Sequence, residues 1–211
     1  MMTKQLHVVS TGQQSREMFV KVVQRIHKYV DAIHIREKTW PAKELIDAIH
    51  ALIEKEVPPE KIIVNDRIDV AYIMKIKGVQ LTHHSVDIAL VREMFPSLRI
   101  GSSVHSSEEA IIAEEKGASH LFFGHIFPTA SKPGVMPRGL DNLKKVIGKV
   151  VIPVIAIGGI TPENTKGILA AGSGGVAVLS GILLANDPLQ AAKEYRNALD
   201  KAEEDDIIER G

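Results

Sequence analysis

The strongest constraint on the fold is a pattern of short apolar, β-branched runs that recurs along the chain of 211 residues. Each run is followed by a stretch with helical periodicity, which is the signature of repeated βα units. The runs are apolar almost throughout instead of alternating, as in parallel strands that are covered on both faces. They span residues 6–10, 32–36, 62–64, 78–81, 98–104, 120–123, 151–159 and 174–180.

The segments between the runs carry helix signals. Residues 42–56 place leucine and isoleucine on one helical stripe, and residues 106–117 and 161–172 each begin with a Ser or Thr cap and end in glycine. Eight strands alternating with helices at about 25 residues per unit predict an α/β fold, the (β/α)8 TIM barrel. The rival is an open doubly wound sheet, but no G-x-G-x-x-G motif follows the first run. We expect a single TIM-barrel domain over residues 1–211, with the barrel at about 1–200 and a charged C-terminal extension at 201–211.

Composition narrows the classes of partner. Lys and Arg number 26, and so do Asp and Glu, so the formal net charge of zero gives no general attraction to nucleic acid or to an anionic membrane. The absence of cysteine excludes disulfides, thiolate zinc sites and cysteine nucleophiles. The opening residues 1–11 hold one lysine and no long apolar stretch, so we expect them not to be a secretory signal, and no run approaches the roughly 20 apolar residues that span a bilayer. We expect a cytoplasmic protein with a small-molecule partner, and the oligomeric state stays open, a homo-oligomer included.

Polar residues cluster where the predicted strands end, which is where TIM barrels place their chemistry. The glycine-rich loops after the seventh and eighth strands predict a phosphate cradle, because backbone N–H groups and a helix N-terminus can approach an anion there. The simpler alternative is that these glycines only turn the chain. The candidate binding residues are Arg36, Lys38, Asp66, Ser103, Thr129, Lys132, Gly158, Gly159, Ser180 and Gly181.

Several of these candidates have structural alternatives. Arg36 and Lys38 could bind carboxylate or phosphate, or they could point outward or pair with Glu37. Asn65 or Asp66 is more simply explained as the cap of the helix that follows. The adjacent pair His83 and His84 lacks the spacing of a convincing metal site, and no metal site is predicted.

His125 is the candidate catalytic residue. It follows an apolar strand at the functional end of the barrel, near residues that could bind an anionic substrate. Imidazole exchanges protons near neutral pH, so His125 is suited to be a general acid or base. The alternative is a hydrogen-bonded loop histidine.

Five motifs together resemble the thiamine-phosphate synthase/TenI family over nearly the whole chain. They are "HIREK", "VNDRIDVA", "IGSSVHSSEEA", "FFGHIFPTASK" and "PVIAIGGITPEN...AAGSGGVAVLSGI". Within that family the chain resembles the TenI branch. His34 stands where synthases have Gln, Ser85 stands where synthases have an aspartate that helps hold magnesium, and His125 stands where synthases commonly have Pro.

The resemblance implies a thiazole tautomerase, an isomerase of thiamine biosynthesis. Its substrate would be the carboxythiazole ethyl phosphate tautomer released by thiazole synthase, with His125 moving the proton and no cofactor. The glycine loops would bind the phosphate, and Arg36, Lys38, Ser103 or Lys132 would neutralise the carboxylate. Two alternatives remain: a magnesium-dependent thiamine-phosphate synthase, and a non-catalytic regulatory protein that binds thiamine precursors.

Overall fold

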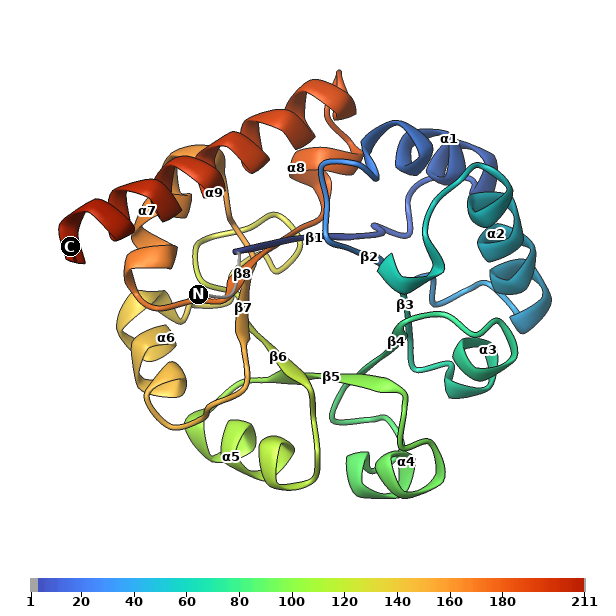
Figure 1. Ribbon diagram of the computed structural model, residues 1–211, viewed down its shortest axis with the longest axis horizontal. Coiled ribbons are helices and arrows are strands. Elements are labelled where there is room, and N and C mark those ends of the chain that lie inside the picture. Colours follow the sequence, from blue (N-terminus) through green and yellow to red (C-terminus); the bar gives the residue numbers. More distant parts are fainter. Residues whose placement is uncertain (1–3, 211) are drawn as a thin grey trace.

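Eight parallel strands form a closed barrel, which confirms the predicted TIM-barrel fold. The computed structural model describes residues 4–210, with side chains as far as Ala202. Each strand pairs with the next in the sequence, and β1 pairs with β8 to close the ring (Figure 1). The strands are β1 (Gln5–Val9), β2 (Ala32–Ile35), β3 (Ile62–Asn65), β4 (Gly78–Leu81), β5 (Arg99–Val104), β6 (His120–Gly124), β7 (Val154–Ile157) and β8 (Gly175–Val178).

Helices follow the strands and surround the ring. The predicted caps are present: the Ser106 side chain accepts the N–H of Glu109 (3.2 Å), and Thr161 is the N-cap of its helix. The predicted terminal glycines, Gly117 and Gly172, both have φ of +94°, which favours glycine. The helical elements are α1 (Arg16–Ile26), α2 (Ala42–Glu54), η1 (Pro59–Lys61), α3 (Ile68–Ile73), α4 (Ile88–Met94), α5 (Ser107–Glu115), α6 (Gly139–Ile147), α7 (Pro162–Ala170), α8 (Ser180–Leu183) and α9 (Pro188–Arg210).

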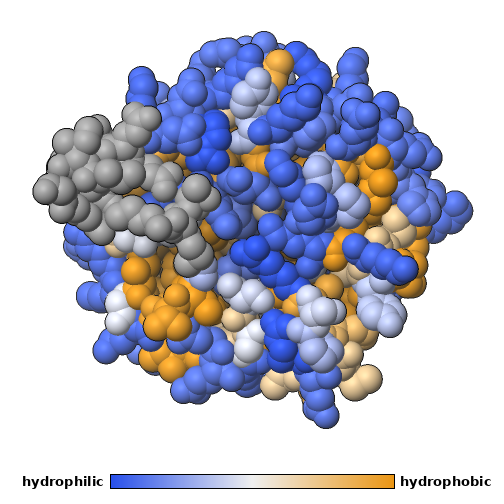
Figure 2. Space-filling model, viewed as in Figure 1, coloured by the Kyte–Doolittle hydropathy of each residue, from blue (hydrophilic) through white to orange (hydrophobic). Residues whose placement is uncertain are grey.

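Two apolar regions stabilise the barrel. The larger lies between strands and helices, and includes Leu6 and Val8 from the outward face of β1. The smaller lies inside the ring, where side chains from β1, β6, β7 and β8 meet. Its buried members are Val9, Phe122, Ile155 and Ala177. The face seen in Figure 2 is mainly hydrophilic, with apolar side chains gathered in separate areas.

Helix α9 ties the end of the chain to its beginning. Arg196 donates to the Asp31 carboxylate (2.9 Å) and to the Lys4 carbonyl (2.9 Å), and Asp31 also accepts the N–H of Leu6 (2.7 Å). The helix runs without a break from Pro188 to Arg210, so its last part is the backbone of residues 201–210 of the charged extension. Residue 211 and the side chains beyond Ala202 lie outside the described residues. None of the described helices combines the length and apolar character that a bilayer crossing requires.

Candidate functional site

The carboxyl ends of the strands bring the predicted site residues to one rim of the barrel. Because all eight strands are parallel in a closed ring, every segment that follows a strand starts on that rim. The candidates lie as follows: Arg36 and Lys38 after β2, Asp66 after β3, Ser103 near the end of β5, His125, Thr129 and Lys132 after β6, Gly158 and Gly159 after β7, and Ser180 and Gly181 at the start of α8.

The segment after β2 presents two cations. Arg36 lies two residues beyond His34, whose side chain is inside the ring, so the alternation of the strand directs Arg36 toward the barrel axis. Arg36 is half-buried and Lys38 is exposed. Glu37 instead accepts the N–H of Gly12 (3.2 Å), and among the described ion pairs it has none with either cation. A pairing of either cation with Glu37 is therefore not what the structure shows.

The ends of β3 and β4 are joined through side chains. The Ser85 hydroxyl donates a short hydrogen bond to the carboxylate of Asp66, which is exposed and has φ of +59°. Ser85 also accepts the N–H of Thr82 (2.7 Å). The expectation that Asn65 or Asp66 caps the next helix is wrong, because the N-cap of α3 is Arg67 and no side chain caps it. The Asp66 carboxylate therefore caps no helix and lies exposed at the rim.

The loop between β6 and α6 is attached to the barrel through His125. Its ring is buried, with 5% exposure, and Nε2 lies 3.1 Å from the carbonyl oxygen of Val135 in the same loop. Arg138 donates to the carbonyls of Gly124 (2.9 Å) and His105 (2.7 Å). In this arrangement one nitrogen of His125 is occupied by the loop.

Thr129 and Lys132 form a turn in the exposed part of that loop. The N–H of Lys132 donates to the Thr129 carbonyl (3.1 Å), and the Thr129 hydroxyl accepts the N–H of Ser131 (3.3 Å). Thr129 is half-buried and Lys132 is exposed. Among the described residues, neither side chain forms a hydrogen bond with a strand. Their role in binding a substrate stays a prediction.

The glycines after β7 are required by close packing. Gly158 has φ of +96°, and a Cβ there would lie 2.3 Å from the Cβ of His125. Gly159 has φ of +70°, and a Cβ there would lie 2.5 Å from the carbonyl oxygen of Pro128. The β6 and β7 loops therefore touch without room for a side chain, which supports the simpler explanation of these glycines.

The segments after β7 and β8 nonetheless contain N–H groups without a hydrogen-bond partner among the described residues. No hydrogen bond of the described residues uses the N–H of Gly159 or of Ser180. At the start of α8, Gly181 makes room for Tyr195, because its Cβ would lie 2.5 Å from the Tyr195 hydroxyl oxygen. The phosphate cradle therefore stays a prediction.

Three histidines inside the barrel were missed as a group by sequence reasoning. His7, His34 and His120 are fully buried, and only His34 drew attention, as part of the segment with Arg36. A signal was present, because each is a lone histidine in an apolar run. Recognising the group requires the register between strands, which the runs alone do not supply.

The chain is similar to thiamine-phosphate synthases over most of its length. The family model described as thiamine monophosphate synthase (TMP-TENI) matches residues 6–182. The thiamine-phosphate synthase of Pyrococcus furiosus is 38% identical over 171 residues, which are 81% of this chain and 83% of that protein. That of Pyrococcus horikoshii is 35% identical over 199 residues, 92% and 94% of the two chains. A solved structure of thiamine phosphate pyrophosphorylase from Pyrococcus furiosus matches with a TM-score of 0.80 at 33% identity, covering 94% and 96%.

These similarities overturn the predicted function. The tautomerase assignment and the isomerase class are wrong, because the relatives are named synthases, which are transferases. The three differences from synthases on which that prediction depended, at His34, Ser85 and His125, do not exclude a synthase in the structure. His34 is buried below the rim, and His125 bonds to its own loop. Ser85 leaves Asp66 in place, and magnesium is commonly held by only one or two carboxylates together with substrate phosphates.

Proposed function

Because the chain belongs to the thiamine monophosphate synthase family, we propose that it is a thiamine-phosphate synthase. The observation that carries the proposal is the 35% identity to a relative of that name over 92% of the chain. The substrates would be a pyrimidine carrying a methylene pyrophosphate and a thiazole phosphate. This replaces the single carboxylated thiazole expected from the sequence.

The proposed reaction is a substitution at carbon without oxidation or reduction. The bond between the methylene carbon of the pyrimidine and the pyrophosphate oxygen breaks, and pyrophosphate leaves with the electron pair. The ring nitrogen of the thiazole supplies the pair that forms the new carbon–nitrogen bond. The protein has to bind two anionic substrates side by side and stabilise the charge on the leaving group.

The rim offers groups of the required charge. Arg36, Lys38 and Lys132 are cations on the β2 and β6 segments, and they suit the pyrophosphate. The free N–H groups of Gly159 and Ser180 suit the phosphate of the thiazole. These assignments of residues to the two anionic groups depend on the proposed synthase function.

Magnesium fits the end of β3 and β4. Asp66 is an exposed carboxylate with the Ser85 hydroxyl beside it, and these oxygens would hold the ion together with water and the substrate. When bound, magnesium would neutralise charge on the leaving pyrophosphate. Asp66 itself supplies the negative charge that places the ion at this part of the rim.

A coupling assay tests the function. Purified protein is incubated with both substrates and Mg²⁺, and thiamine phosphate is measured by the fluorescence of its oxidation product. We expect product only when both substrates are present, with one pyrophosphate released per product. Binding of both substrates without product, at any Mg²⁺ concentration, would contradict a synthase and would favour the non-catalytic binding protein.

A further inference from the structure

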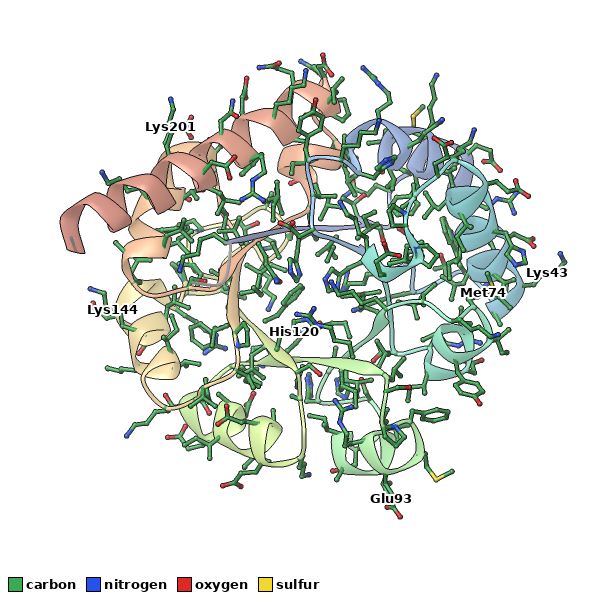
Figure 3. The ribbon with its side chains drawn as sticks, in the orientation of Figure 1. Lys43, Met74, Glu93, His120, Lys144 and Lys201 are labelled. Carbon is green, nitrogen blue, oxygen red and sulfur yellow. The ribbon has the colours of Figure 1, made fainter. Side chains whose placement is uncertain are left out.

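Three imidazole rings from β1, β2 and β6 meet inside the barrel. His7 Nδ1 lies 3.0 Å from His34 Nε2, and the His120 ring lies edge-on to both, with centroids 5.8 and 6.2 Å away. One ligand nitrogen from each of the three residues lies within 4.8 Å of the others. Figure 3 shows His120 inside the ring of strands. Among the described residues this is the one group of three or more His, Asp or Glu side chains that is close enough to share one ion.

The cluster contains polar atoms without partners. Both nitrogens of His120 and Nδ1 of His34 are buried and accept or donate no hydrogen bond, and the same holds for Oε1 of Gln80. Each such atom lowers the folding stability of the protein when it is left unpaired. A Cβ on Gly101 would lie 2.1 Å from Gln80 Oε1 and 2.5 Å from His120 Nε2. Because glycine has no side chain, Gln80 and His120 can both approach the backbone at this position. The cluster therefore has buried, unpartnered atoms that a shared ligand could bind.

The tautomer of His7 directs a lone pair into the cluster. Its Nε2 lies 2.9 Å from Gln5 Oε1, an acceptor, so Nε2 carries the proton and Nδ1 is unprotonated toward His34. Metal-bound histidines usually donate their other ring N–H to an oxygen in this way, which fixes the ring and raises its basicity. Gln5 thus occupies the position of such an outer partner.

We propose that His7, His34 and His120 bind one divalent transition-metal ion that prefers nitrogen ligands, such as Zn²⁺, with Gln80 or a water molecule as the fourth ligand. In a tetrahedral site two nitrogens at about 2.0 Å from zinc lie about 3.3 Å apart. Ring rotations must therefore draw the three ligand atoms together. The His7–His34 hydrogen bond is replaced by two metal bonds.

The surroundings select the kind of ion. Burial lowers the pKa of all three histidines, to about 3 for His120. Lys77 and Arg99 lie close enough to lower these pKa values further, and they also oppose a dication. Mg²⁺ and Ca²⁺, which need carboxylate oxygens, are disfavoured here, whereas the covalent affinity of Zn²⁺ for imidazole can overcome this repulsion.

The three histidines lie below the rim, and Gln80 Nε2 donates to the hydroxyl of Ser103 (3.1 Å). Phe122 contacts His34, with ring centroids 4.7 Å apart, and belongs to the apolar layer inside the ring. His7, His34 and His120 are each at most 1% exposed, so no open position faces solvent. A metal here would be structural, and this inference does not depend on the proposed synthase activity.

The test uses Zn²⁺ and Co²⁺ as probes. Chelator-treated full-length protein is unfolded, refolded with one equivalent of either ion, and freed of loose metal, because a sealed site fills most readily during folding. We expect one ion per chain, the intense visible bands of four-coordinate Co²⁺, and a higher melting temperature. Replacing His120 by Asn should weaken binding by about 100-fold or more, since even the loss of an outer partner costs 10–100-fold.

The control separates this cluster from the exposed histidines. The double variant His83→Asn/His84→Asn removes two adjacent surface rings and should keep full binding. X-ray absorption at the zinc edge of the wild-type protein counts the imidazole ligands, so the test does not depend on a variant that folds. Fewer than three imidazoles, unchanged binding in His120→Asn, or no bound ion after refolding would each overturn the proposal, and ordered water would then be the partner of these nitrogens.

Discussion

The hydroxyl of Ser85, after β4, donates a hydrogen bond to the carboxylate of Asp66, after β3. Two neighbouring strands thus place one anionic and one neutral oxygen group together on the rim. The neutral group avoids repulsion between two carboxylates in the absence of a cation. Of these two residues, Asp66 is therefore the one that can offer a negatively charged oxygen to magnesium.

Changing Ser85→Asp should strengthen magnesium binding. A second carboxylate beside Asp66 adds a charged oxygen ligand, so the Mg²⁺ concentration for half-maximal coupling should fall by about tenfold, or about 1.4 kcal/mol. The measurement is the coupling rate against Mg²⁺ concentration. Ser85→Ala is the matched variant and should not lower that concentration. An unchanged Mg²⁺ dependence in Ser85→Asp would show that the ion binds elsewhere.

Changing Asp66→Asn should reduce the coupling rate by about 100-fold or more, since the variant loses the charge that holds the ion. Asp69→Asn is the matched control, because Asp69 is also exposed but pairs with Arg67. The two variants are compared for coupling rate at the Mg²⁺ concentration that half-saturates the wild-type protein, and for melting temperature. Equal losses in both would argue against a specific role of Asp66.

Changing Gly159→Ala should destabilise the protein by about 2–4 kcal/mol, because a positive φ and a clash with the Pro128 carbonyl add together. Gly134 provides the matched control: its φ is +74°, but nothing lies within 4 Å of its Cβ position. Gly134→Ala should therefore cost only about 1 kcal/mol. Urea unfolding of both variants measures the difference, and similar losses would mean that the two loops separate easily.

Changing His125→Ala should release the β6–α6 loop, since the side chain bonded to the Val135 carbonyl is lost. We expect faster cleavage between residues 129 and 137 by a protease of broad specificity, and a higher KM for the pyrophosphate substrate. A fall in kcat with unchanged cleavage and KM would instead place His125 among the groups that act on the substrate.

Acid should destabilise the metal-free protein below about pH 6.5. The folded-state pKa of His120, about 3, lies below the value of 6.5 in the unfolded chain, so the unfolded chain binds more protons between these values. Stability is therefore present above pH 6.5 and is lost as the pH falls toward 3. His120 alone should cost about 2 kcal/mol at pH 5, and His7 and His34 act in the same direction.

Urea midpoints between pH 8 and pH 5, measured in a chelating buffer, test this dependence. His50 is exposed, so His50→Gln should leave the slope with pH unchanged, whereas His120→Gln should reduce it. A wild-type stability that stays constant down to pH 5 would show that these rings are protonated inside the barrel.

The fold could be predicted from the sequence because its signals are local. Each apolar run overlaps a strand, and Ser106, Gly117 and Gly172 mark helix ends where the structure has them. The histidine cluster could not, because it depends on the register of β6 against β1 and β2 across the barrel. The Ser85 substitution was misjudged for a related reason: its effect depends on Asp66, which belongs to another strand.

The pairing of β1 with β8 has a consequence for synthesis of the chain. During translation the first strand emerges long before its final neighbour, which begins at Gly175. Until then β1 has an unpaired edge, and so does whichever strand has been made last. Such edges can bind strands of other chains, so the nascent protein is exposed to aggregation for most of its synthesis.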